Sequence, residues 1–379
     1  MRGRDMQGHR LIRAGIAGMG TWARMAHLPA LLANPNVAVV AVADDARASL
    51  DAASSLLPEG CSVYADPLAM LAGEALDLVC IVTPDDAHAG PVRAAVAAGT
   101  HIVCEKPLAI SGAEAWELAR LVEAAGLVNR VGFTVRYSPA MTALKTLIDG
   151  DAIGEPHLVL GLQQNGQFLD PAKPFHWKMD KTRTGGGAIV EYGIHTLDLA
   201  LWLGGPVCRV QAIGQTLVPE RPLLDGSDTR VITVDDSTGW LIEYENGGKG
   251  IGHAGWATPG RAPGLEFRVY GSNGAARVEL SEAHPGDEAL WLSGPDGNFE
   301  LLELPGPGSH PWYAHWIGAL IDDTIDEILG RPHRGDPTFA DGARAQDLLD
   351  AALTSMATGA FTLVGATNAE RNASGAPAT

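Results

Sequence analysis

A lysine and a histidine far apart in the chain are the side chains best suited to move a proton. Lys106 follows an apolar run, His101–Cys104, after Glu105, and the proline after Lys106 favours an extended backbone there. His195 lies in a mostly apolar stretch with helical spacing, Gly187–Leu203, on the same face as Glu191. An imidazole acts as a general acid or base near neutral pH, and an ammonium group stabilises negative charge on oxygen. Each residue alone is commonly structural, so its weight depends on the elements that position it.

A glycine-rich turn after the first apolar run predicts a dinucleotide site. Gly18 and Gly20 stand in a G-x-G-x-x-A pattern that follows Leu11–Ala17 and opens a helix. Such a turn lets a pyrophosphate approach the backbone at a helix N-terminus. Asp44, directly after the next apolar run, can accept from both ribose hydroxyls and repels a 2′-phosphate, which favours NAD over NADP. Arg47 could instead bind a 2′-phosphate, so NADP stays open.

The elements that must carry these residues change in character along the chain. We expect strands at 11–17, 37–43, 76–82, 101–104 and 131–135, and helices at 22–33, 47–56, 87–98 and 113–125. Apolar strands alternating with helices are typical of a parallel sheet covered on both faces. After a helix at Pro139, we expect strands at 157–164, 207–218, 229–234, 240–244, 250–256, 265–270, 275–280 and 289–292, and helices at 187–203, 312–329 and 340–358. Strands that follow one another in this way favour an antiparallel sheet.

Composition excludes several classes of protein. The 379 residues carry 27 Lys and Arg against 45 Asp and Glu, a formal charge of −18, which argues against a nucleic-acid partner. No apolar run approaches the roughly 18 residues of a membrane span, and we expect no membrane partner. The four cysteines form no C-x-x-C pair, so we expect a reducing, cytoplasmic compartment. The histidines have no metal-binding spacing, and we expect no metal site.

Several segments together resemble the glucose–fructose oxidoreductase/inositol dehydrogenase (Gfo/Idh/MocA) family. The matching segments are GMGTWA (18–23) with His27 after it, VTPDDAH (82–88), CEKP (104–107), VGFTVRYSP (131–139), GGGAIVEYGIHTLDLALWLGG (185–205) and FADGARAQDLLDAALTSMATG (339–359). The resemblance implies an α/β fold with an NAD(P)-binding Rossmann domain, here at 10–132. It also implies a C-terminal α+β domain with a large, mostly antiparallel open sheet, here at 133–365. We expect the small, polar tail 366–379 to be disordered.

The resemblance also assigns residues to roles. It implies that NAD, or else NADP, contacts Gly18, Gly20, Thr21, Trp22, Asp44, Thr83, Pro84, His88, Glu105 and Lys106. Lys106 and His195 match the family's catalytic lysine and histidine. We expect a small polyhydroxylated substrate, a sugar or cyclitol, to contact Arg136, Trp177, Lys178, Glu191 and His195. The family's sheet often forms a subunit interface, which implies a homodimer or homotetramer.

The predicted reaction is hydride transfer between a secondary alcohol carbon and the nicotinamide. His195 accepts the hydroxyl proton and Lys106 stabilises the oxyanion. Glu191, the third expected catalytic residue, orients His195 or binds a neighbouring hydroxyl, although the family commonly has Asp at this position. Three alternatives stay open: a redox-neutral glycosidase that retains its cofactor, a non-catalytic cofactor-binding regulator, and an enzyme that reduces a C=N or C=C bond.

Overall fold

The structure is a computed structural model that describes residues 11–258, 264–281, 288–304 and 312–365 of the chain. The chain folds into two compact units. The first contains residues 1–137 and 309–343, and the second contains 138–308 and 344–379. The tail predicted at 366–379 lies outside the described residues.

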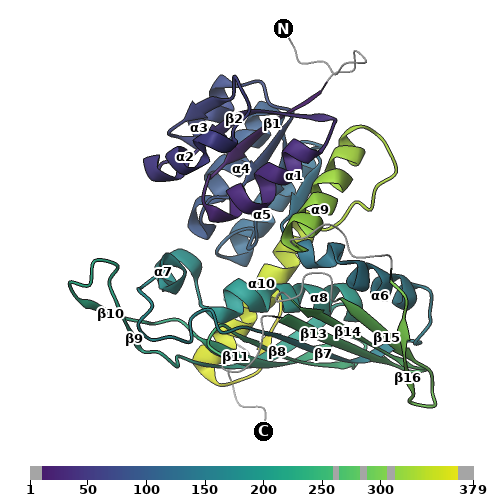
Figure 1. Ribbon diagram of the computed structural model, residues 1–379. Helices are drawn as coiled ribbons and strands as arrows, with labels where there is room; N and C mark the ends of the chain where they lie inside the picture. Colours follow the sequence, from purple (N-terminus) through teal and green to yellow (C-terminus); the bar gives the residue numbers. More distant parts are fainter. Residues whose placement is uncertain (1–10, 259–263, 282–287, 305–311, 366–379) are drawn as a thin grey trace. The chain divides into compact units, whose positions relative to one another are not determined.

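The first unit is built on a six-stranded sheet in the order β3-β2-β1-β4-β5-β6. Every described pairing in it is parallel, as predicted. Its strands are β1 (Ile12–Ala17), β2 (Val37–Ala43), β3 (Ser62–Tyr64), β4 (Leu78–Ile81), β5 (His101–Cys104) and β6 (Asn129–Val131). Its helices include α1 (Leu28–Ala33), α2 (Arg47–Ala53), α3 (Pro67–Gly73), α4 (Ala89–Ala98), α5 (Gly112–Ala124) and α9 (Trp312–Ile328) (Figure 1). A Rossmann-type parallel sheet is therefore confirmed.

One predicted strand of this unit is wrong. We expected a strand over 131–135, but β6 ends at Val131 and a 3₁₀ turn, η4 (Thr134–Tyr137), follows. The chain turns at this point because the Phe133 amide donates to the Val131 carbonyl at 2.7 Å. The Val131 amide donates to the Pro337 carbonyl instead of to another strand.

The long helix α9 completes the first unit, although it is far from the rest of that unit in sequence. It packs against α1 and against a π-helical turn, η1 (Ala23–His27). Its acidic residues Asp323 and Glu327 form ion pairs with Arg130, whose side chain is 1% exposed. A buried guanidinium needs such partners, because an unpaired charge is costly away from water.

The second unit is built on a nine-stranded sheet in the order β16-β15-β14-β13-β7-β12-β11-β8-β17. The pairings are antiparallel except between β12 and β7, which confirms a large, mostly antiparallel sheet. Its strands are β7 (Pro156–Gln164), β8 (Val207–Gln215), β11 (Ser237–Tyr244), β12 (Lys249–Gly255), β13 (Gly264–Gly271), β14 (Ala275–Ser281), β15 (Ala289–Ser293), β16 (Phe299–Leu302) and β17 (Thr362–Leu363). A separate two-stranded hairpin pairs β9 (Glu220–Pro222) with β10 (Thr229–Val231).

Helices cover one face of the nine-stranded sheet. The helix α6 (Pro139–Asp149) packs on β14 and β15, and α8 (Ile194–Gly204) packs on β7 and β12, as Figure 1 shows. Helix α10 (Phe339–Thr358) contributes residues to both units. Side chains on β11 alternate between the buried, helix-covered face and the opposite, more exposed face. The periodicity of the sequence therefore sets which face is covered.

The helix predicted at 187–203 begins with a π-helical turn. This turn, η6 (Ile189–Gly193), leads directly into α8. A π turn adds one residue to the helical repeat and changes which side chains share a face, and such turns are frequent at functional sites. Glu191 lies in η6 and His195 lies in the first turn of α8, so the irregular turn sets how these two predicted catalytic residues are placed relative to each other.

Candidate functional site

The glycine turn of the first unit has the geometry that a pyrophosphate requires. Gly18 has φ +93°, and a Cβ there would lie 2.5 Å from the Val82 carbonyl oxygen, so glycine is needed. At Gly20 a Cβ would meet nothing within 4 Å, so the backbone is open on that side. The turn lies between β1 and the helix that begins at Thr21.

Asp44 fixes the second part of this nucleotide site. Its side chain is 9% exposed and accepts from the backbone amides of Met19 at 2.6 Å and Ala46 at 2.8 Å. The carboxylate therefore ties the glycine turn to the end of β2. Each carboxylate oxygen has a further lone pair for a ribose hydroxyl.

The segment that ends β5 places Lys106 at the same edge of the sheet as the glycine turn. Parallel strands bring their carboxyl ends to one edge, and Gly18 follows β1 while Lys106 follows β5. Lys106 is half-buried, whereas Glu105 is only 8% exposed. Ligands of open α/β sheets bind at this edge, so the position of Lys106 suits a catalytic group.

The Glu105 carboxylate is bonded within the protein. One oxygen accepts from Trp22 Nε1 at 2.8 Å and lies 2.8 Å from His27 Nε2. The other accepts from the Lys106 amide at 3.2 Å. Glu105 and Trp22 thus have structural contacts here, and their predicted contact with the cofactor stays a prediction.

Three other predicted cofactor residues surround the end of β4. Thr83 and Pro84 are partly exposed, and the Thr83 hydroxyl donates to the Ala87 carbonyl at 3.1 Å. His88 is fully buried, and both of its ring nitrogens lie close to backbone carbonyls. Such burial suits a supporting role better than direct contact with a ligand.

Arg136 has the contacts of a structural residue within the first unit. Its side chain is 2% exposed, with Nη1 3.0 Å from the Asp336 carboxylate and Nη2 3.8 Å from that of Asp341. Neither partner was expected from the sequence, because both lie about 200 residues away in the chain. Its contact with substrate remains a prediction.

In the second unit, a buried aspartate holds the start of the helix that carries Glu191 and His195. The Asp235 carboxylate accepts from the amides of Gly187 at 2.7 Å and Ile189 at 2.8 Å, and its carbonyl accepts from the Ala188 amide. A Cβ on Gly187 would lie 2.0 Å from the Asp235 carbonyl oxygen, which explains the glycine. This aspartate was missed from the sequence, where it appears only as one of two acids after an apolar run.

The Glu191 carboxylate forms an ion pair with Lys178. The two side chains are 19% and 27% exposed, so the pair is partly shielded from water. His195, one helical turn after Glu191, is half-buried, and Asp198 is 1% exposed. Two predicted substrate-binding residues, Lys178 and Glu191, are thus brought together by the fold.

The loop before the glycine segment presents an aromatic face between cations. Lys178 Nζ lies 5.8 Å and Arg183 Cζ 5.4 Å from the ring centre of Trp177. Trp177 is partly exposed, as a side chain that stacks on a sugar ring must be.

Lys106 belongs to the first unit and His195 to the second, and their meeting around one oxygen stays a prediction.

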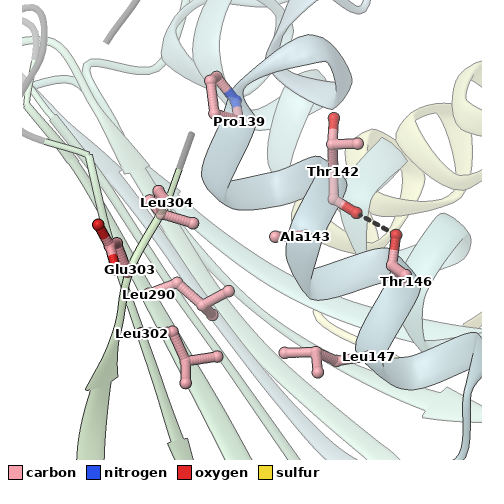
Figure 2. A pocket seen from close by; sticks show the side chains of 9 residues that line it. All are labelled: Pro139, Thr142, Ala143, Thr146, Leu147, Leu290, Leu302, Glu303 and Leu304. Carbon is pink, nitrogen blue, oxygen red and sulfur yellow. Dashed lines mark hydrogen bonds between the residues drawn. The ribbon is translucent and has the colours of Figure 1, made fainter. Parts of the chain in front are cut away.

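A separate groove in the second unit differs in chemistry from these residues. Figure 2 shows it between α6 and the strands β15 and β16, with Leu147, Leu290, Leu302 and Leu304 among its lining residues. Its volume is about 490 Å³. Among the described residues, the lining is mostly apolar and contains no histidine or lysine, so this part of the groove does not suit a polyhydroxylated substrate.

Two further features bear on the kind of site. Among the described residues, no group of three or more His, Cys, Asp or Glu side chains is arranged to hold a metal ion. None of the helices in the described ranges combines the length and the apolar character needed to cross a bilayer.

Comparison with known families decides the relationship. The family described as "Oxidoreductase family, NAD-binding Rossmann fold" matches residues 12–133, and the "GFO/IDH/MocA C-terminal domain" matches residues 141–277. The levoglucosan dehydrogenase of Pseudarthrobacter phenanthrenivorans is 32% identical over 74% of this chain and 78% of its own. The chain belongs to the Gfo/Idh/MocA oxidoreductase family.

Other members of the family extend the match over nearly the whole chain. The inositol 2-dehydrogenase of Rhizobium meliloti is 27% identical over 91% of this chain and 97% of its own. A structure of levoglucosan dehydrogenase in complex with NADH and levoglucosan has a TM-score of 0.83 and is 26% identical, covering 94% of this chain and all of the other. The Gfo/Idh/MocA Rossmann domain binds NAD, and the open backbone at Gly20 and the acid at Asp44 fit that cofactor.

Proposed function

We propose that the protein is an NAD-dependent dehydrogenase that moves a hydride between a secondary alcohol carbon of a sugar or cyclitol and the nicotinamide. The observation that carries the proposal is the position of Lys106, at the end of β5 on the sheet edge that holds the glycine turn. Relatives named as levoglucosan and inositol dehydrogenases support the substrate class.

The residues of the first unit hold the cofactor. Gly18 and Gly20 leave room for the pyrophosphate, and Asp44 accepts from the ribose. Bound NAD supplies the hydride acceptor. The preference for NAD over NADP is supported by Arg47, whose Nε donates to the Asp51 carboxylate at 2.8 Å on the surface.

The proton is moved by side chains of the chain itself. As the carbinol carbon loses its hydride, His195 takes the hydroxyl proton on its imidazole, and a carbonyl group forms. The Lys106 ammonium group donates to the same oxygen and stabilises the negative charge that develops on it. In the reverse direction, His195 returns the proton to the oxygen of a ketone.

Glu191 and Trp177 act on the rest of the substrate. The ammonium group of Lys178 fixes the Glu191 carboxylate, which then accepts from a neighbouring hydroxyl or orients His195. Trp177 offers a flat face for the sugar ring, and Lys178 beside it offers a donor. These contacts select a ring with several hydroxyl groups.

Within the described residues, no helix covers the second face of the nine-stranded sheet, and this uncovered face supports a homodimer or homotetramer. Leu160, Ile251 and Leu241 lie side by side in the register of β7, β12 and β11. The side chains of Ile251 and Leu241 are 52% and 37% exposed. A second copy of the chain would bury this aliphatic row, which is costly to leave in water.

Lys106→Ala tests the proposal directly. We expect its kcat with the polyol that the parent oxidises fastest to fall about 100-fold or more, while the Kd of NADH changes by about threefold or less. The parent is first denatured to identify any released nucleotide and then assayed with NAD and NADP against sugars and cyclitols. An unchanged kcat in the variant refutes the role of Lys106.

The same assays separate the alternatives. A redox-neutral glycosidase would release the leaving group of an aryl glycoside without net NADH. A regulator would yield no NADH with any polyol. An enzyme that reduces C=N or C=C bonds would prefer NADPH and ignore polyols.

A further inference from the structure

Two fully buried histidines contact the residues on either side of Lys106. His88 is 0% exposed, and its Nδ1 lies 2.8 Å from the Pro107 carbonyl oxygen. His27 is also 0% exposed, and its Nε2 lies 2.8 Å from a carboxylate oxygen of Glu105. The proposed hydride transfer uses neither histidine to move a proton.

His88 joins the two loops that follow β4 and β5. Its second nitrogen, Nε2, lies 2.9 Å from the Thr83 carbonyl oxygen. Carbonyl oxygens only accept hydrogen bonds, so each contact is made by a ring N–H, and the tautomer decides which nitrogen carries it. Through these bonds, His88 fixes the backbone at Pro107 against the end of the neighbouring strand.

His27 acts on the other side of Lys106. It shares its Glu105 oxygen with Trp22 Nε1, and the remaining Glu105 oxygen accepts from the Lys106 amide. The backbone at Gly132 closes the space behind this carboxylate, since a Cβ there would lie 2.8 Å from it. The carboxylate therefore has little freedom to move and holds the Lys106 backbone.

We propose that His27 and His88 are positioning residues for Lys106 and hold its backbone from both sides. This inference rests on the proposed role of Lys106 in hydride transfer. A fixed backbone restricts the directions that the Lys106 ammonium group can take. The hydrogen bond from Lys106 to the transition state then forms without the cost of ordering the loop. Loss of this fixed backbone should therefore lower kcat and leave cofactor binding nearly unchanged.

The two nitrogens of His88 can be tested separately. The amide nitrogen of asparagine is as many bonds from Cα as Nδ1, and that of glutamine is as many as Nε2. His88→Asn therefore keeps a donor for Pro107, His88→Gln keeps a donor for Thr83, and His88→Phe keeps neither. His101→Asn is the matched control, because His101 lies at the opposite end of β5, where its Nδ1 accepts from the Val128 amide at 3.0 Å.

For each variant of the full chain, kcat and KM are measured with the polyol that the parent oxidises fastest, together with the Kd of NADH by fluorescence and the Tm. We expect His88→Phe to lower kcat about 10- to 100-fold, with the Kd of NADH within about threefold of the parent. His88→Asn should recover more of the lost kcat than His88→Gln. The His101 variant should change the Tm without a matching loss of kcat.

Two results would overturn the inference. One is a kcat for His88→Phe within about twofold of the parent. The other is equal kcat values for the asparagine and glutamine variants, which still decides the matter if the phenylalanine variant does not fold. Lys106→Ala separates the positioning role from the proposed function. If it keeps its activity, both fail, and if it loses activity while the His88 variants do not, the positioning role fails alone.

Discussion

At the scale of single residues, Glu105 shows how contacts decide the state of a buried acid. Burial by itself would raise the pKa of Glu105. The hydrogen bond and charge of His27, the charge of Lys106 and the hydrogen bond of Trp22 outweigh burial and lower the pKa to about 2. A carboxylate that is ionised at neutral pH can accept the bonds that fix the loop of Lys106.

This lowered pKa predicts a loss of stability in acid. The ordinary pKa is 4.5, so the ionised form contributes its full stability above about pH 4.5 and loses it as the pH falls toward 2. At about 1.4 kcal/mol for each pH unit, the contribution is on the order of 3 kcal/mol. Thermal unfolding of the parent and Glu105→Gln between pH 3 and 6 measures it, and the gap in Tm should narrow as the pH falls.

Glu117→Gln is the control, because Glu117 is an exposed acid with a pKa that Arg93 lowers through a hydrogen bond. Solvent screens that pair, and we expect little change in Tm at any pH. A difference in Tm between the parent and Glu105→Gln that stays constant from pH 6 to pH 3 would contradict the lowered pKa of Glu105.

At the scale of elements, the start of the helix that carries Glu191 and His195 depends on Asp235, a residue from a distant loop. Asp235 accepts from two amides of the helix start and from the Thr238 hydroxyl at 2.7 Å. The two amides lie at the start of the helix, where it offers them no carbonyl acceptor of its own. The fixed positions of Glu191 and His195 therefore depend on an acid more than 40 residues away in the chain.

Asp235→Asn should destabilise the second unit. An amide presents an N–H group to one of the three donors, so at least one buried hydrogen bond is lost, at a cost of about 1–3 kcal/mol. Urea unfolding of the full chain measures the change. Asp296→Asn is the control, since Asp296 is an exposed acid that bonds the Asn298 amide in a turn. An equal change in the free energy of unfolding for the two substitutions would contradict a stabilising role for the Asp235 hydrogen bonds.

The elements themselves could be predicted where burial on both faces makes a continuous apolar run. The strands at Val37–Ala43 and His101–Cys104 have the predicted limits. The short strand Ser62–Tyr64 was missed because three residues on an edge carry no periodic signal, and the helix Pro67–Gly73 was missed because it makes only about two turns. The π turn at Ile189–Gly193 was not predicted either, and Asp235, which bonds the amides at its start, lies more than 40 residues away in the chain.

The candidate site also has parts that could be predicted from the sequence and parts that could not. Lys106, His195 and the glycine turn could be chosen as candidates because each lies in a short local motif. The partners that hold them could not, because the contact between His27 and Glu105 joins residues 78 apart and that between Asp235 and Gly187 joins residues 48 apart. Such pairs arise from topology, and local spacing does not report them.

At the scale of the whole molecule, the uncovered sheet face predicts association of two copies. Ile251→Glu would place a charge in the middle of the aliphatic row, and we expect the molar mass by light scattering to fall to that of the monomer. Leu224→Glu is the control, because Leu224 is 87% exposed in the β9–β10 turn, away from this row. A parent that is monomeric, or an Ile251 variant with unchanged mass, would contradict the proposed interface.

The place of helix α9 in the first unit has a consequence for how the protein is made. A ribosome completes β6 long before it reaches Asp323 and Glu327, the carboxylates that neutralise Arg130. Until then Arg130, which is buried in the folded unit, lacks the two carboxylates that neutralise its charge. The first unit therefore finishes folding only after helix α9 has been synthesised, and an N-terminal fragment that stops at residue 137 should not fold stably by itself.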